Sequence, residues 1–143
     1  MGIPGHILTS GGAFVVAFAA TNSILVGVCV AAGSLLLDLD HLFDYFVVDQ
    51  QRSLNPFRFF RYYSKLTSLR RLLLLHSYEL LALVLACGVI AWSRVLVALV
   101  TGGFIHLGAD ILPRGGAHRW RAMKQYSFGY RWYCGFQSSR IYR

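Results

Sequence analysis

The stretch Leu35-Leu-Leu-Asp-Leu-Asp-His-Leu-Phe-Asp44 decides the fold, because an apolar run ends there in three carboxylates around one histidine. The same association recurs along the 143-residue chain. Five of its six acidic residues lie within four residues of a histidine: Asp38, Asp40 and Asp44 near His41, Glu79 near His76, and Asp110 near His106. A charge beside hydrocarbon costs several kcal/mol unless it is paired or bound to a metal ion. Mixed imidazole and carboxylate clusters suit a divalent cation, so the pattern predicts a metal site at the edge of a membrane.

The composition indicates a membrane protein. Hydrophobic residues make up 56% of the chain and charged residues only 14%, whereas roughly one quarter of a soluble domain is charged. No linker divides the sequence, so we expect one domain over residues 1–143. The three cysteines form no CxxC pair, which argues against a disulfide scaffold and fits a reducing cytoplasmic face.

Four apolar stretches predict four membrane helices, at residues 7–20, 23–37, 72–92 and 95–112. A short polar turn at Asn22 separates the first two, and a second turn at Arg94 separates the last two. We therefore predict an all-α protein, an integral membrane four-helix bundle made of two helical hairpins.

The alternative to the first hairpin is one continuous helix, and geometry distinguishes the two. At about 1.5 Å per residue, such a helix would hold His6 and Asp38 roughly 48 Å apart, on opposite faces of a membrane. A turn at Asn22 returns Asp38 to the face where His6 lies. A turn at Arg94 does the same for His76 and His106, so two hairpins gather all four side chains on one face.

The positive charges predict the orientation in the membrane. Of fourteen Lys and Arg residues, six lie in the connection at residues 45–71, seven in the tail at residues 113–143, and one is Arg94. Because positively charged loops stay in the cytoplasm, we expect a multi-pass protein of the inner (cytoplasmic) membrane with both termini and the metal site at the cytoplasmic face. An alternative is that residues 1–20 form a secretory signal, but the first twelve residues contain no Lys or Arg.

The spacing within each cluster favours joint binding of a cation. A carboxylate one helical turn from an imidazole can share the ion with it or fix its tautomer. We predict the metal ligands to be His6, Asp38, His41, His76, His106 and Asp110. Three other carboxylates are candidates for a general base or for orienting a ligand: Asp40, Asp44 and Glu79. The expected ion is Zn²⁺, with Mn²⁺ or Fe²⁺ as alternatives.

Each of these residues also has a plainer explanation. Asp38 and Asp40 are suited to capping the next helix, and Glu79 could pair with Arg70 or Arg71. Unrelated caps would not be expected to gather on the same membrane face, however. The metal site therefore explains the set better than separate structural roles do.

Two basic segments interleave cations with aromatic rings, at residues 57–63 and 120–136. Such segments lie in the lipid headgroup layer, and the same pattern can bind nucleic acid. Because both segments flank predicted membrane helices, we expect anionic membrane lipids as partners and no nucleic acid. The residues predicted to contact lipid phosphate are Arg58, Arg61 and Arg131.

The ordered motifs resemble the bacterial and archaeal inner-membrane metal-dependent hydrolases, a group distantly similar to zinc-dependent phospholipase C. The resemblance rests on His6, Asp38-Leu-Asp40-His41, His76-Ser77 and His106-xxx-Asp110, and covers roughly residues 1–112. Leu37 stands where the family has proline, and four leucines replace an Arg/Gly-containing lead-in to His76.

The resemblance implies metal-assisted hydrolysis, in which the cation activates water and stabilises charge on the attacked group. We expect the substrate to be a phospholipid or another lipid-linked phosphoester. Ser77 is a weaker candidate for a nucleophile than for a hydrogen-bond donor. A metal-stabilised membrane adaptor without catalysis and a small ion or proton carrier are the alternatives, although residues 80–100 offer no acid or histidine for a relay.

Overall fold

The computed structural model describes residues 3–64 and 70–141. Helices account for most of the described residues, which contain no strand, and this confirms the all-α prediction. The elements are α1 (Ile3–Thr21), α2 (Ile24–Leu36), α3 (Leu39–Phe43), the π-helical segment η1 (Asp44–Val48), α4 (Pro56–Ser64), α5 (Tyr78–Ile90), α6 (Arg94–Ile111), α7 (Gly116–Gln125), α8 (Phe128–Tyr133) and α9 (Ser138–Ile141).

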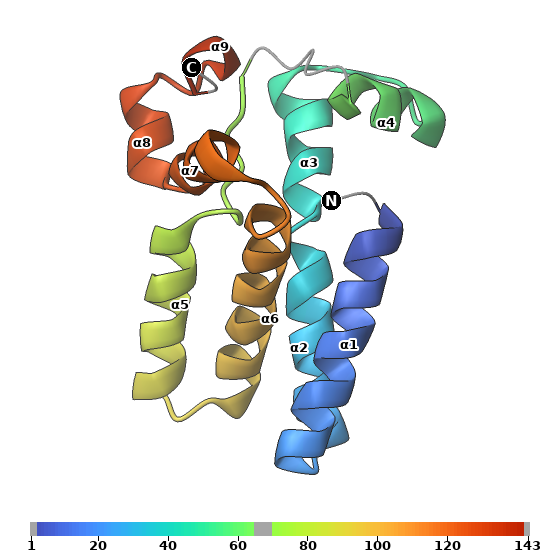
Figure 1. The fold of residues 1–143 in the computed structure, drawn as a ribbon, viewed down its shortest axis with the longest axis vertical. Helices are drawn as coiled ribbons and strands as arrows, with labels where there is room; N and C mark the ends of the chain where they lie inside the picture. The colour runs from blue at the N-terminus through green and yellow to red at the C-terminus, as the bar shows by residue number, and fades with distance from the viewer. Residues whose placement is uncertain (1–2, 65–69, 142–143) are drawn as a thin grey trace.

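Two sharp turns produce two antiparallel helix pairs, α1 with α2 and α5 with α6 (Figure 1). Asn22 has a φ of 49° in the first turn, and Trp92 has a φ of 51° in the second. These left-handed values reverse the chain within a few residues. Ser23 and Ser93 follow, and each hydroxyl oxygen accepts a hydrogen bond from a backbone N–H three residues on, which caps α2 and α6. The turns therefore lie where the sequence predicts them.

The two pairs meet through α2 and α6, whose backbones approach closely at two glycines. A Cβ atom on Gly33 would overlap the carbonyl group of Leu99, and one on Gly102 would overlap the carbonyl oxygen of Val30. Small residues are what allow apolar helices to pack at such short range. This contact brings the ends of α2 and α6 together, and these ends carry the polar cluster.

The predicted helix at residues 72–92 is wrong at its start, because α5 begins only at Tyr78. Residues 72–77 form no helix, and side chains from elsewhere bind their backbone. The carboxylate of Asp44 accepts a hydrogen bond from the N–H of Leu72. The carboxylate of Asp40 accepts one from the N–H of His76. These partners satisfy the backbone without a helix.

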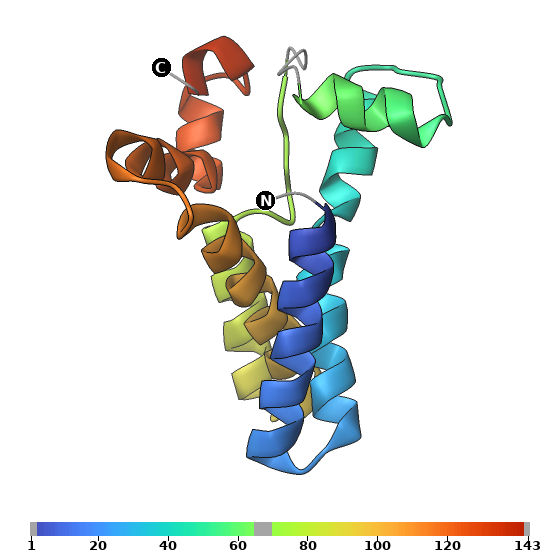
Figure 2. The same cartoon turned by 45° about the vertical axis from the view of Figure 1, so that its right-hand side comes forward.

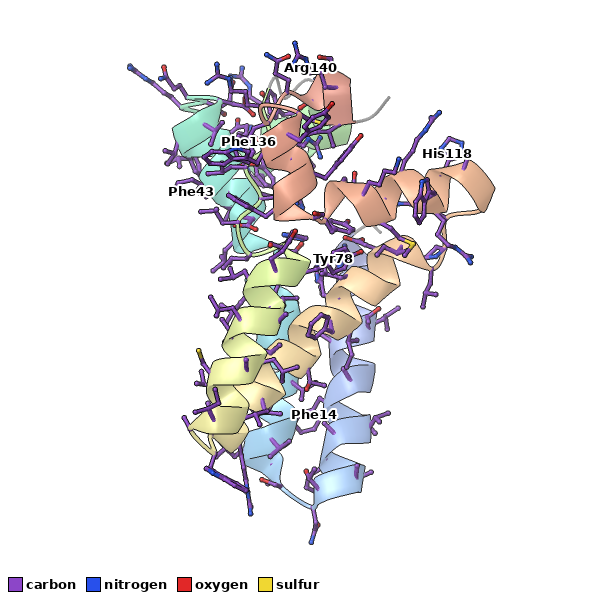
Figure 3. All side chains as sticks on the ribbon, turned by 90° about the vertical axis from the view of Figure 1, so that its left-hand side faces the viewer. Phe14, Phe43, Tyr78, His118, Phe136 and Arg140 are labelled. Atoms are coloured by element: carbon purple, nitrogen blue, oxygen red, sulfur yellow. The ribbon has the colours of Figure 1, made fainter. Side chains whose placement is uncertain are left out.

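Two helical runs are long and apolar enough to cross a membrane, Ile24–Val48 and Arg94–Ile111. The apolar helices at Gly5–Thr21 and Tyr78–Ile90 are shorter. Large apolar side chains are exposed along all four, and Figure 3 shows them projecting from the lower part of the molecule. Charged side chains gather instead at the opposite end, around the labelled His118 and Arg140.

The short helices lie at one end of the four long ones, opposite the two tight turns (Figures 1 and 2). α4 lies across the end of η1, and the ring of Tyr45 packs edge-on against Phe59 and Tyr62 at centroid distances of 5.1 and 5.3 Å. α7 and α8 lie over the ends of α5 and α6, and α9 lies beyond α8, further from the long helices. The polar cluster lies between these caps and the long helices.

Candidate metal centre

The imidazole of His106 on α6 lies at the middle of the polar cluster and is 0% exposed. Its Nε2 lies 3.3 Å from Nε2 of His76, 3.6 Å from Oδ1 of Asp38 and 3.7 Å from Oδ2 of Asp110. Asp38 comes from the junction of α2 and α3, and His76 from the segment before α5. Three segments that are distant in the sequence therefore place ligand atoms around one point.

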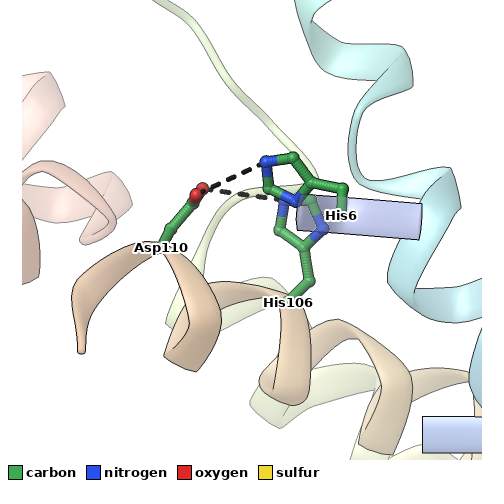
Figure 4. A group of neighbouring side chains, drawn as sticks. All are labelled: His6, His106 and Asp110. Atoms are coloured by element: carbon green, nitrogen blue, oxygen red, sulfur yellow. Dashed lines mark ion pairs between the residues drawn. The ribbon is translucent and has the colours of Figure 1, made fainter. Parts of the chain in front are cut away.

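α1 adds a fourth segment to the cluster. Nε2 of His6 lies 3.5 Å from Oδ1 of Asp110, and its ring stacks on that of His106 with the centroids 4.5 Å apart (Figure 4). Asp110 thus directs one carboxylate oxygen toward His6 and the other toward His106.

The donor atoms fit a metal ion. They form two overlapping groups, in each of which all ligand atoms lie within 4.8 Å of one another: His6, His106 and Asp110, and Asp38, His76 and His106. Nδ1 of His76 lies 3.2 Å from a carboxylate oxygen of Asp40, so Nδ1 carries the hydrogen and Nε2 presents its lone pair to the cluster. Lone pairs that converge from imidazoles and carboxylates are stabilised by a borderline divalent cation. These residues, all buried except Asp38, can therefore hold a metal ion.

Further side chains hold two of the ligands in place. Oδ2 of Asp40 accepts hydrogen bonds from both the backbone N–H and the ring Nδ1 of His76, at 2.8 and 3.2 Å. The hydroxyl of Tyr126, at the end of α7, donates to Oδ2 of Asp110 at 2.9 Å. A carboxylate behind a metal-binding histidine fixes the ring orientation and raises its basicity. Of the two roles predicted for Asp40, the contacts favour orienting a ligand.

His41 lies beside the cluster rather than within it. Its ring centroid is 5.0 Å from that of His76, with the planes tilted by 43°. It belongs to neither group of converging ligand atoms. The structure therefore brings together five of the six predicted ligands and leaves His41 as a neighbour of one of them.

The two other predicted general-base candidates bind backbone groups instead of facing the cluster. Asp44 is 0% exposed and accepts a hydrogen bond from the N–H of Leu72 at 3.0 Å. Glu79 caps the start of α8: it accepts hydrogen bonds from the N–H groups of Phe128 and Gly129, and from the hydroxyl of Ser127. These contacts give both residues a structural role, and the prediction of a catalytic base stays a prediction.

Ser77 is a capping residue. Its hydroxyl donates to Oε2 of Glu79 at 2.8 Å and accepts from the N–H of Leu80, which caps α5. These contacts agree with the prediction of a hydrogen-bond donor.

The prediction that Arg131 contacts lipid is wrong. Its side chain is 0% exposed, and it donates hydrogen bonds to the carbonyl oxygens of Leu73, His76 and Gln125. Burial lowers the pKa of Arg131, and the negative charge of nearby Glu79 partly offsets this effect. The guanidinium therefore joins the segment before α5 to α7 and α8.

By contrast, the other two predicted lipid contacts remain on the surface. Arg58 and Arg61 are exposed on α4. Their position is compatible with a contact to lipid phosphate.

Sequence reasoning missed the roles of Tyr126 and Arg131 at this site. Both lie in the basic and aromatic tail, where their neighbours Trp120, Trp132 and Tyr133 are exposed. The tail has no regular apolar period that would separate buried from exposed residues. No local signal therefore identifies these two as the tail residues that reach the cluster.

Comparison with known proteins adds no relative. No family model, no curated protein and no solved structure matches this chain. The resemblance of its motifs to the inner-membrane metal-dependent hydrolases thus stays a prediction.

Proposed function

We propose that this protein is a membrane-bound metal-dependent hydrolase that cleaves a phospholipid or another lipid-linked phosphoester at the cytoplasmic membrane face. The convergence of ligand atoms around Nε2 of His106 carries the proposal. Unlike an isolated pair of charges, this cluster places one imidazole nitrogen and two carboxylate oxygens between 3.3 and 3.7 Å from one buried imidazole nitrogen. The ordered His and Asp motifs shared with the hydrolases support the reaction class.

The surface of the molecule supports a place in the membrane, with α1, α2, α5 and α6 as an integral four-helix bundle. Side chains such as Leu8, Val16 and Ile90 are between 69% and 79% exposed, and hydrocarbon is the solvent that favours such a surface. Apart from Arg94, the basic residues that the structure describes all belong to the connection and tail at the end that carries the cluster. That arrangement favours a cytoplasmic position for the site.

The chain's own residues supply position, orientation and access. A bound Zn²⁺, or Mn²⁺ or Fe²⁺, supplies the Lewis acidity that activates water and stabilises charge on the attacked phosphoryl group. Asp40 orients His76, and Tyr126 orients Asp110. The side chain of Asp38 is 38% exposed, whereas those of His76 and His106 are 0% exposed. Substrate and water therefore reach the cluster along Asp38.

Elemental analysis of the detergent-purified protein tests the proposal. We expect stoichiometric metal in the parent and a loss of metal in His106→Ala and Asp38→Ala, because each change removes one of the converging ligands. His118→Ala is the matched control, since His118 is exposed on α7 and should keep the metal. A parent protein without metal would refute the site. A lipid-hydrolysis screen with the loaded protein then tests the reaction.

One observation favours a second function, a metal-stabilised membrane adaptor. Asp40, Asp44 and Glu79 each bind backbone N–H groups, so these three carboxylates stabilise the fold. Catalytic and structural metal sites differ mainly in an open coordination position. Metal without turnover of any lipid phosphoester would support the adaptor and contradict the hydrolase.

A further inference from the structure

An open apolar pocket lies directly beside the cluster. Its volume is about 470 Å³, within the range of roughly 300–1,000 Å³ that is typical of small-molecule sites. α3 and η1 form one wall, and the segment before α5 forms the other. The apolar lining residues are Leu39, Leu42, Phe43, Phe46, Val47, Leu74 and Leu75. Asp40 is the polar residue of the lining.

The lining determines what kind of ligand the pocket can take. The carboxylate oxygen of Asp40 is already bound to the backbone and the ring of His76. The remaining lining is hydrocarbon, so a polar ligand group placed there would lose its hydrogen bonds to water without replacement. An apolar chain is the ligand that such a surface favours.

The pocket connects to the metal centre through two residues. The first is Asp40, which lines the pocket and binds the ring of His76, and Nε2 of His76 faces His106. The second is Leu39, which lines the pocket and directly follows Asp38 in the sequence; Asp38 is the partly exposed member of the cluster. A chain bound in the pocket can therefore present the group at its polar end to the side from which the cluster is accessible.

Charge favours an anionic group at that polar end. α4 packs on Tyr45 of η1, next to the pocket wall, and carries the exposed side chains of Arg58 and Arg61. In Figures 1 and 2 this helix lies across the end of η1, as an interfacial helix lies across a membrane-crossing one. The whole chain has a net charge of +8, which favours an anionic lipid over a second copy of the same chain.

We propose that this pocket binds one acyl chain of an anionic phospholipid and so presents the headgroup phosphoester to the cluster. The inference rests on the proposed hydrolase function and narrows its substrate class to a lipid held by its chain. A water-soluble phosphoester lacks the part of the substrate that the pocket recognises.

Photocrosslinking of the full chain in nanodiscs tests the pocket directly. The probe is phosphatidylglycerol with a photoactivatable group on its acyl chain, and the adducts are mapped by peptide mass spectrometry. We expect adducts to concentrate on residues 39–47 and 74–75. Leu42→Trp and Val47→Trp fill the pocket and should each lower these adducts about tenfold, as expected when a bound chain is displaced by overpacking. Leu83→Trp is the matched control, because Leu83 is exposed on α5 outside the pocket.

The outcomes separate this inference from the proposed function. Adducts spread evenly over the exposed apolar residues of all four long helices would overturn the pocket, as would crosslinks from the pocket to a second copy of the chain. Unchanged adducts in both tryptophan variants would overturn it too. The His106→Ala variant should retain the adducts although it lacks the ion. A parent protein with the adducts but without metal would support the pocket and refute the hydrolase.

Discussion

The two ends of the molecule are held together by different forces. Along the apolar part, α2 and α6 touch through glycines at positions 33 and 102, where backbone meets backbone. At the cluster end, polar side chains reach across to backbone groups, as Asp40 does to His76 and Arg131 to Leu73. Close packing of backbone against backbone carries the first contact. The cluster end instead stabilises a segment that forms no helix, and that segment supplies His76 of the candidate metal centre.

The largest effect is expected from removing the buried guanidinium. Arg131→Ala leaves three backbone carbonyls without a donor, and we expect it to lower the free energy of unfolding by about 3–5 kcal/mol. Thermal unfolding in detergent, followed by circular dichroism, measures the change. Arg140→Ala is the control, since Arg140 is exposed on α9. Equal stabilities of the two variants would show that the cluster end does not depend on this contact.

A smaller effect is expected from widening the contact between the apolar helices. Gly102→Ala places a Cβ against the carbonyl oxygen of Val30, and since backbone cannot yield like a side chain, α2 and α6 must separate. We expect a loss of about 1–3 kcal/mol in the same unfolding measurement. Gly12→Ala on α1 is the control, because its Cβ would meet nothing within 4 Å. If both variants unfold alike, the glycine contact is not what joins the two hairpins.

Asp40→Asn distinguishes orientation of a ligand from stability of the fold. The amide keeps the size of the side chain and can still accept from the N–H of His76, but it no longer carries the charge that polarises the imidazole. We expect the metal affinity to fall about 10–100-fold and the unfolding temperature to change little. Competition with a chromogenic chelator measures the affinity. Asp49→Asn, outside the His and Asp clusters, should leave it unchanged; a similar loss in both would argue against a specific role for Asp40.

The smallest effect is expected at the surface of α4. Replacing Arg58 and Arg61 by glutamine should weaken the preference for anionic over neutral lipids by about 1 kcal/mol for each arginine. Lipid binding in nanodiscs at low and high salt measures this preference, and salt should reduce it in the parent. Arg94→Gln at the opposite end is the control. A double variant that keeps the parent's preference would remove α4 from the proposed interface.

Local pattern was sufficient to predict the path of the chain. The polar residues around Asn22 and Arg94 mark turns that the structure places there, and the turns bring His6, Asp38 and His106 to one end of the molecule. Apolar runs and turn-forming residues are short-range signals, so they can be recognised in a single sequence.

Contacts between distant segments are what the sequence did not reveal. The run of leucines before His76 reads as helix, yet its backbone is bound by Asp44 and Arg131, which lie 28 and 58 residues from the groups they bind. The sequence neighbours of Arg131 are basic and aromatic residues, which are typical of a protein surface. Burial of such a side chain depends on partners that no local period encodes.

The way the segment before α5 is held has a consequence for how the protein matures. Its supports come from both sides of the chain: the carboxylates of α3 and η1 are synthesised before it, and the guanidinium of α8 long after it. A nascent chain that ends at Ile111 already contains every histidine and aspartate of the cluster but not Arg131, which donates to the backbone carbonyl of His76. Ion capture is therefore expected to be a late step in biogenesis, completed only after α8 has left the ribosome.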